Sequence, residues 1–267
     1  MTQSASPSLT PSSLTPSSSG RVVAIASGKG GVGKTWFAIT LAHALARQGR
    51  RVLLFDGDLG LANVDIQLGL MPALDLGSVI AGRASLAEAT LHHADGDFGI
   101  VVGRSGSGAL STLDPAVLER VLEALRAAAG KHDLVLLDLG AGLDRSVRRM
   151  AAWADELLVL ATEEPTSLTD AYAVLKLHAA DRGADRGVGA ASVVVNQAAS
   201  RPGGERTYAT LARACATFLG HAPPLLGVVR RDERVRDAIR RQTLLLTRHP
   251  ACAAAQDVEA AARALLG

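Results

Sequence analysis

The chain has 267 residues, of which 48% are hydrophobic and 20% charged, so it can bury one sizeable core. Its formal net charge is only +2 and only 3% of its residues are aromatic, so composition gives no argument for nucleic-acid binding. Cys215 and Cys252 lack the nearby cysteine partners of a metal site or a disulfide framework, which fits a reducing cytoplasm. No apolar run reaches the about 18 residues that a membrane-spanning helix needs, so no such span is expected.

The first 20 residues differ in composition from the rest of the chain. They are mainly Ser, Thr and Pro, and the unit Ser-Leu-Thr-Pro-Ser occurs at residues 8–12 and again at 13–17. Such a segment cannot bury enough apolar surface to fold, so residues 1–20 are predicted to be a disordered tail. A docking or phosphorylation segment is the alternative. Residues 21–267 are predicted to form a single domain.

Seven short aliphatic runs predict strands, at residues 22–26, 51–56, 99–102, 133–138, 156–160, 192–196 and 225–229. The runs are continuously apolar rather than alternating, as in strands of a parallel sheet covered on both faces. Helical patterns occur at 37–48, 114–129, 166–180 and 257–266, with Asp114 as an expected N-cap and Pro115 as the first helical residue. The predicted fold is a doubly wound, mostly parallel α/β sheet that binds ligands at the carboxyl ends of its strands.

The stretch between the first strand and the first helix, residues 27–35, predicts a nucleotide site. It fits the pattern Gly-x-x-x-x-Gly-Lys-Ser/Thr from Gly28 to Thr35. Glycines let successive backbone N–H groups turn toward a phosphate, Lys34 can reach the β- and γ-phosphates, and the Thr35 hydroxyl can ligate Mg²⁺. The residues predicted to bind the nucleotide here are Gly28, Gly30, Gly31, Val32, Gly33, Lys34 and Thr35.

Carboxylates follow two further predicted strands. Asp56 ends the second strand, Asp58 comes two residues later, and Asp138 ends the fourth strand. Because the carboxyl ends of parallel strands share one rim, Asp56 and Asp138 are expected near the loop, where they can hold Mg²⁺ directly or through water. Asp58 lies past the strand end, where it can orient a water toward the γ-phosphate. Taken singly, each aspartate could instead cap a helix.

The loop has a second lysine near its start, Lys29, and in this it resembles the deviant Walker A loop of the MinD/ParA class of P-loop ATPases. The resemblance narrows to the flagellar-number regulators of that class, the FlhG/FleN family. Residues 52–70, which contain DGDLGLANVD, and the block EPTSLTDAYA at 164–173 are similar to theirs. The similarity covers roughly residues 21–265.

The resemblance implies a P-loop NTPase fold, ATP and Mg²⁺ as cofactors, and slow ATP hydrolysis to ADP and phosphate. It implies an ATP-dependent homodimer in which Lys29 reaches the phosphates bound to the partner subunit. Asp58 then positions or activates the attacking water. The implied site residues are Lys29, Lys34 and Asp58 for catalysis, Asn196 and Asp232 for the base, and Thr35, Asp56 and Asp138 for Mg²⁺.

The chain departs from this class at several positions. Trp36 stands where relatives usually have a small or polar residue, and Arg230 stands where they have a proline. Residues 1–20 lack the Asp-Gln-Ala motif with which many flagellar regulators stimulate the GTPase FlhF. Residues 257–266 read as a covering helix rather than an amphipathic membrane helix, so peripheral membrane contact is not expected.

The leading hypothesis is a cytoplasmic, dimerising ATPase switch that sets flagellar number or placement. Its partners would be flagellar proteins, such as the SRP-type GTPase FlhF or a flagellar transcription regulator. One alternative is a ParA-type DNA-partition module that uses the six arginines between residues 230 and 241, although the interleaved acids favour a solvated helix face. Another is a positioning ATPase of a pilus, chemotaxis or cellulose system. A reductase of the nitrogenase-iron-protein type is disfavoured because paired cluster cysteines are absent.

Overall fold

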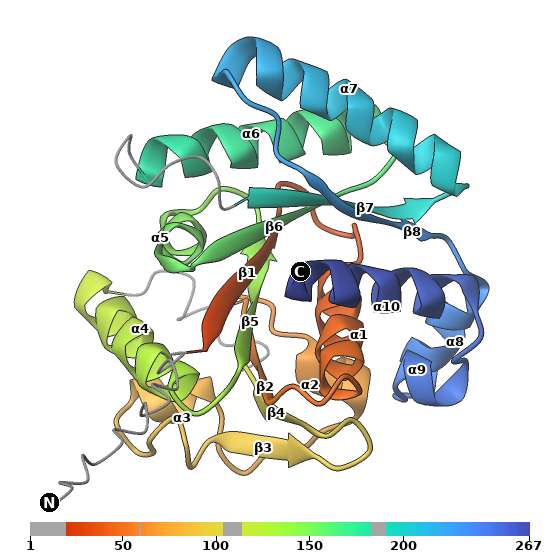
Figure 1. Cartoon of the computed structure of the whole chain (residues 1–267). Helices are drawn as coiled ribbons and strands as arrows, with labels where there is room; N and C mark the ends of the chain where they lie inside the picture. The colour runs from red at the N-terminus through yellow and green to blue at the C-terminus, as the bar shows by residue number, and fades with distance from the viewer. Residues whose placement is uncertain (1–19, 59, 104–113, 183–190) are drawn as a thin grey trace, which may run out of the picture.

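The computed structural model describes residues 20–58, 60–103, 114–182 and 191–267 (Figure 1). The predicted N-terminal tail lies outside these residues, apart from Gly20. The described strands form one eight-stranded sheet in the order β3-β4-β2-β5-β1-β6-β7-β8. Neighbouring strands pair in parallel, except that β3 is antiparallel to β4. The predicted doubly wound, mostly parallel sheet is therefore confirmed.

The strands of this sheet are β1 (Arg21–Ser27), β2 (Val52–Gly57), β3 (Thr90–His93), β4 (Phe98–Val101), β5 (Leu134–Ala141), β6 (Glu156–Ala161), β7 (Ala191–Ala198) and β8 (Leu225–Arg230). The described helices are α1 (Lys34–Ala46), α2 (Val64–Leu68), α3 (Leu76–Ile80), α4 (Pro115–Ala129), α5 (Arg145–Trp153), α6 (Pro165–Arg182), α7 (Arg201–Leu219), α8 (Glu233–Arg240), α9 (Leu245–Arg248) and α10 (Ala253–Leu266).

Helices cover both faces of the sheet (Figure 1). Helices α3 to α7 share one hydrophobic core with the sheet, and α1, α2, α8, α9 and α10 share the other. The side chains of β1 alternate between these two cores: Val22 and Ala24 lie in the first, and Val23 and Ile25 in the second. Because both faces are buried, the strand sequences are apolar throughout.

All seven predicted strands are present, with ends that differ from the prediction by a few residues. The eighth, β3, was not predicted because its sequence, Thr-Leu-His-His, is short, mostly polar and located at the edge of the sheet. Helix α1 begins at Lys34, earlier than predicted, because the left-handed backbone of Gly33 starts the helix directly after the loop. The Asp114 cap is confirmed: its carboxylate accepts from the backbone N–H of Ala116 at 2.7 Å.

The register of the central strands places the predicted acidic residues together. Strands β2 and β5 pair so that Asp56 lies opposite Asp138. Two residues earlier, Leu54 and Leu136 face the core that contains α1, so strand alternation directs both aspartates to the side of α1. Strand β1, which leads into the phosphate loop, is the other neighbour of β5. Loop and carboxylates therefore meet at one rim of the sheet.

No helix within the described parts of the chain is both long enough and apolar enough to cross a bilayer.

A buried histidine in α6 should make the fold sensitive to mild acid. His178 is 5% exposed, and neither ring nitrogen has a hydrogen-bond partner among the described residues. Burial, and then the charge of Arg182, lower its pKa from 6.5 to about 4. Between these values the unfolded chain binds a proton that the folded chain does not, so stability falls as pH drops below about 6.5. His178→Leu is expected to reduce the loss of unfolding free energy between pH 7 and pH 5, measured by urea titration.

The matched control is His92→Leu, because the side chain of His92 is 64% exposed. That variant should show the wild-type loss between pH 7 and pH 5. An unchanged loss in His178→Leu would contradict the assignment.

Candidate functional site

The loop between β1 and α1 forms an open cradle. Gly31 and Gly33 have φ angles of 81° and 84°, which residues with side chains rarely adopt. A Cβ atom at Gly33 would lie 2.7 Å from Nδ2 of Asn196, whereas Gly30 and Gly31 face open space. Helix α1 begins at Lys34 directly after the loop, so the positive end of its dipole lies there. Such a cradle suits an anionic phosphate.

Lys34 and Asp138 form a buried ion pair beside this cradle. Nζ of Lys34 lies 3.3 Å from Oδ1 of Asp138, and the two side chains are 8% and 0% exposed. The Thr35 hydroxyl also hydrogen-bonds to Asp138. Burial raises the pKa of Asp138, and the charge of Lys34 is the main opposing influence. The second carboxylate oxygen, Oδ2, is buried without a hydrogen-bond partner among the described residues.

Asp56, also buried, fixes the segment that follows β2. Its Oδ2 accepts from the backbone N–H groups of Asn63 and Val64, each at 3.1 Å, and its Oδ1 accepts from that of Asp58 at 3.2 Å. Burial raises the pKa of Asp56 to about 7, and the neighbouring Asp138 adds to the rise, while these N–H groups oppose it. Two carboxylates thus lie side by side and buried, and among the described residues one lysine, Lys34, offsets their negative charge.

These groups fit a divalent cation. Mg²⁺ prefers hard oxygen ligands, and this rim offers two buried carboxylates and a hydroxyl. The unpaired Oδ2 of Asp138 is an acceptor that would otherwise be costly to bury. A cation would also relieve the repulsion that raises the pKa of Asp56. The sequence prediction of a metal-binding rim is therefore compatible with the geometry.

Asp58 lies just beyond Asp56, where β2 gives way to the next segment. Its Oδ1 accepts from the N–H groups of Gly60 at 3.2 Å and Leu61 at 2.9 Å. A Cβ placed on Gly140 of β5 would lie 3.4 Å from the same oxygen, so Asp58 sits against the end of β5. The carboxylate is held by backbone donors at the rim, close to both buried aspartates.

The second lysine of the loop is held within its own subunit. Nζ of Lys29 lies 2.6 Å from Oε2 of Glu164 and 3.2 Å from Oγ1 of Thr166, at the start of α6. Both charged side chains are exposed, at 41% and 65%. The contact lowers the pKa of Glu164. Nearby, the Ser167 hydroxyl accepts from the N–H of Thr162 at 3.0 Å and fixes the turn into α6.

An opening next to the loop is lined by the residues that were predicted to bind the base. It has a volume of about 310 Å³, and its lining includes Gly31, Trp36, Asn196, Gln197, Asp232 and Arg236. The Asn196 amide donates to the carbonyl of Val32 at 2.8 Å, and the Gln197 amide donates to that of Gly31 at 3.1 Å. Both amides support the loop, and Asn196 also borders the space where a base could lie.

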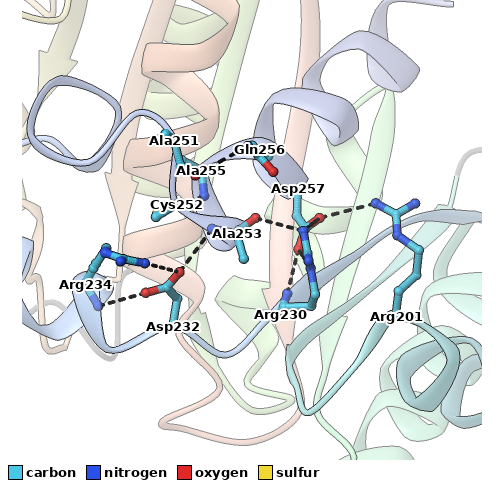
Figure 2. A network of polar contacts seen from close by, with 10 residues as sticks. All are labelled: Arg201, Arg230, Asp232, Arg234, Ala251, Cys252, Ala253, Ala255, Gln256 and Asp257. Carbon is cyan, nitrogen blue, oxygen red and sulfur yellow. Dashed lines mark hydrogen bonds and ion pairs between the residues drawn. The ribbon is translucent and has the colours of Figure 1, made fainter.

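Asp232 ties together the helices that border this opening. Its Oδ1 accepts from the N–H of Arg234 at 3.0 Å and so caps α8. Its Oδ2 accepts from the N–H of Ala253 at 3.1 Å, at the start of α10 (Figure 2). Asp232 therefore lines the opening and also shapes it by joining α8 to α10.

Arg230, where the family resemblance led us to expect a proline, belongs to the same network. Figure 2 shows Arg230 facing Asp257 of α10, with Arg201 approaching from α7. Asp257 is 3% exposed. It accepts from the backbone N–H of Arg230 at 3.0 Å, from its Nε at 2.8 Å and its Nη2 at 2.9 Å, and from Nη2 of Arg201 at 3.2 Å. A proline would lack all three Arg230 donors.

The fold and the phosphate cradle define a P-loop nucleotide-binding protein. Residues 23–245 match the CbiA family, described as the CobQ/CobB/MinD/ParA nucleotide binding domain, and the chain belongs to this family. It is 39% identical to the antiactivator FleN of Pseudomonas aeruginosa over 230 residues, which cover 86% of this chain and 80% of FleN. It is 30% identical over 163 residues to the flagellum site-determining protein YlxH of Helicobacter pylori, covering 61% of this chain and 55% of YlxH.

A solved structure supports the same conclusion. The septum site-determining protein MinD of Pyrococcus horikoshii, in complex with Mg-ADP, superposes with a TM-score of 0.75 at 26% identity. The match covers 92% of this chain and 95% of that one. The predicted membership of the MinD/ParA class is confirmed, and so is the similarity to FleN.

The sequence predicted that the carboxylates share one rim, but not all of the contacts that support the loop and the opening. Gln197 has a φ of 56°, and its side chain supports the loop. Neither property could be predicted, because a polar residue at the end of a strand is common. The ion pair of Arg230 with Asp257 joins residues far apart in the chain, so only the fold reveals it. The departure from proline at Arg230 was the one available hint.

The Arg230 network should contribute measurably to stability. Arg230→Ala removes both side-chain donors to a buried carboxylate while keeping the backbone N–H, and we expect a loss of about 3 kcal/mol in unfolding free energy. Arg201→Ala is the control, because Arg201 is 57% exposed and makes a single contact, so its loss should stay below about 1 kcal/mol. Urea titration of both variants measures the difference. Equal losses would contradict the role assigned to Arg230.

Proposed function

We propose that this chain is an ATP-dependent, dimerising switch ATPase that regulates flagellar number or placement through partner proteins. The observation that carries the proposal is the meeting of the phosphate loop, the Lys34–Asp138 pair and Asp58 at one rim, with Lys29 exposed at its edge. We further propose that residues 21–267 act as one ATPase domain in the cytoplasm, where ATP is available.

In this proposal the loop from Gly28 to Thr35 binds the phosphates of ATP through its backbone and through Lys34. Thr35, Asp56 and Asp138 would hold Mg²⁺, which when bound neutralises phosphate charge. Because Lys34 contacts Asp138, arriving phosphates compete for its ammonium group. On the far side of the loop, Asn196 and Asp232 border the base, as their place in the opening suggests.

Hydrolysis needs a water aligned with the γ-phosphate. Asp58 is half-buried, whereas the two neighbouring aspartates of the rim are fully buried. Its Oδ1 is held by backbone donors, so it can orient a water without moving. The bond that breaks joins the γ-phosphorus to the oxygen that bridges it to the β-phosphate, and the products are ADP and phosphate. We assign Asp58 to this step.

Dimerisation is supported by exposed apolar side chains in the segments that follow two strands of the rim. Leu61, Ile66 and Met71 follow β2 and are 71%, 55% and 98% exposed, and Leu143 follows β5 at 39%. Exposed apolar side chains in such segments favour a protein-contact surface. A second copy placed face to face on this rim would cover them and bring Lys29 of each subunit to the phosphates of the other.

The flagellar role rests on the similarity to FleN and YlxH. Partners would be flagellar proteins, such as the GTPase FlhF or a flagellar transcription regulator. The DNA-partition alternative depends on free arginines near α8, and the structure pairs most of them. The pairs are Arg230–Asp257, Arg234–Asp232, Arg236–Glu233 and Arg241–Asp237. That pairing favours the predicted solvated helix over a nucleic-acid surface.

Two variants of the rim should separate hydrolysis from dimerisation. With Mg-ATP, Asp58→Ala should accumulate as a dimer because ATP stays uncleaved, whereas Lys29→Ala should bind Mg-ATP and remain a monomer because the cross-subunit charge is missing. Light scattering measures mass, and calorimetry measures binding. A monomeric Asp58→Ala with saturating ATP would contradict the switch. The matched control Lys176→Ala, in the middle of α6, should dimerise like the wild type.

The flagellar role predicts a phenotype in the source organism. Deleting the gene should change the number or position of flagella, counted by electron microscopy, and the wild-type gene should restore them. The Lys34→Ala gene should not restore them, because the phosphates lose their main cation. Unchanged flagella after deletion, together with ATP-dependent binding of DNA that weakens with salt, would support the partition alternative instead.

A further inference from the structure

Trp36 stands at the junction between the phosphate loop and the opening under Asn196 and Asp232. It follows Lys34 and Thr35 in the first turn of α1, and its side chain lines that opening together with Gly33. The residue is only 7% exposed. A nucleotide whose phosphates lie on the loop and whose base lies near Asp232 must pass Trp36 where its sugar joins its phosphates.

The indole of Trp36 has a polar atom that the protein does not satisfy. Nε1 is buried and has no hydrogen-bond partner among the described residues. Leaving a buried donor unpaired is energetically unfavourable. Indole N–H groups in protein interiors usually find an acceptor. If the side chain served only to pack against α8, an apolar ring without this donor would serve better.

Both apolar and polar side chains surround the opening that Trp36 lines. Val235 and Ile239 of α8 pack against the same core as Trp36 and line the same opening. The amides of Asn196 and Gln197 are already engaged with loop carbonyls. The indole N–H is therefore an uncommitted donor between the loop and the base-binding side.

We propose that Trp36 is a nucleotide-binding residue, whose indole forms one wall of the opening and whose N–H donates to an oxygen at the sugar–phosphate end of a bound nucleoside di- or triphosphate. Because Nε1 is buried, the indole turns toward the opening as the ligand enters. This inference rests on the proposed nucleotide site.

The indole N–H can be observed directly, because the chain has only two tryptophans. In protein labelled with ¹⁵N, each gives one indole N–H signal, and Trp36→Phe and Trp153→Phe assign them. Trp153 belongs to the other core, where the guanidinium of Arg126 lies 4.4 Å from its ring centre. Saturating Mg-ADP should shift the Trp36 signal downfield, as a new hydrogen bond does, and leave the Trp153 signal in place.

Affinity supplies the second readout. Calorimetry with Mg-ADP should show about tenfold weaker binding for Trp36→Phe, which loses one hydrogen bond to a charged ligand, and unchanged binding for Trp153→Phe. If Trp36→Phe does not fold, tryptophan can be replaced by 3-benzothienylalanine in the Trp153→Phe background. That analogue keeps the ring size and removes only the N–H donor, so the same loss is expected.

The outcomes distinguish this inference from the function on which it rests. If the wild-type chain does not bind Mg-ADP, the nucleotide site itself is wrong. If it binds Mg-ADP while the Trp36 signal stays unshifted, or while the donor-free variants bind as tightly as the wild type, Trp36 only packs and the inference is overturned.

Discussion

The site depends on the pairing of β2 with β5, which brings Asp56 and Asp138 into register on the face of α1. Burial raises the pKa of both carboxylates, and repulsion by Asp138 adds to the rise at Asp56. The fold offsets this in two ways: backbone N–H groups solvate Asp56, and Lys34 contacts Asp138. Among the described residues one oxygen of Asp138 still has no partner. The side chains of the rim therefore leave negative charge uncompensated, which favours binding of a cation.

On the side of the opening away from the carboxylate rim, two aspartates join β8 and α8 to α10. Asp232 caps α8 and also accepts from the start of α10, while Asp257 of α10 binds Arg230 at the end of β8. The turn between β8 and α8 is thus attached to the last helix at two points. A proline at this point would restrict the backbone directly. Here Arg230 instead makes a long-range ion pair with Asp257, so the shape of the opening depends on α10.

Sequence patterns predicted the fold and the rim because both follow from local rules. Apolar runs marked the strands, and the parallel topology then required Asp56 and Asp138 to share an edge. Contacts between distant segments could not be predicted in this way. The pairing of Arg230 with Asp257 depends on where α10 packs, and the surroundings of the Trp36 side chain depend on where α8 packs. Strand β3 was missed for a third reason: an edge strand needs no continuous apolar run, so its sequence carries little signal.

The contact between Lys29 and Glu164 provides a physical basis for the proposed switch. Both side chains are exposed, so water and salt compete with their attraction, and the pair is weak compared with a buried one. It can nevertheless keep Lys29 in a defined place at the edge of the loop while the chain is alone. A triphosphate on a second subunit concentrates more negative charge than one carboxylate, in a site that dimerisation would shield from water. Lys29 would then exchange Glu164 for phosphate only when both nucleotide and partner are present. Because Glu164 opens the segment that most resembles flagellar regulators, its release on dimerisation would alter that segment in step with the nucleotide.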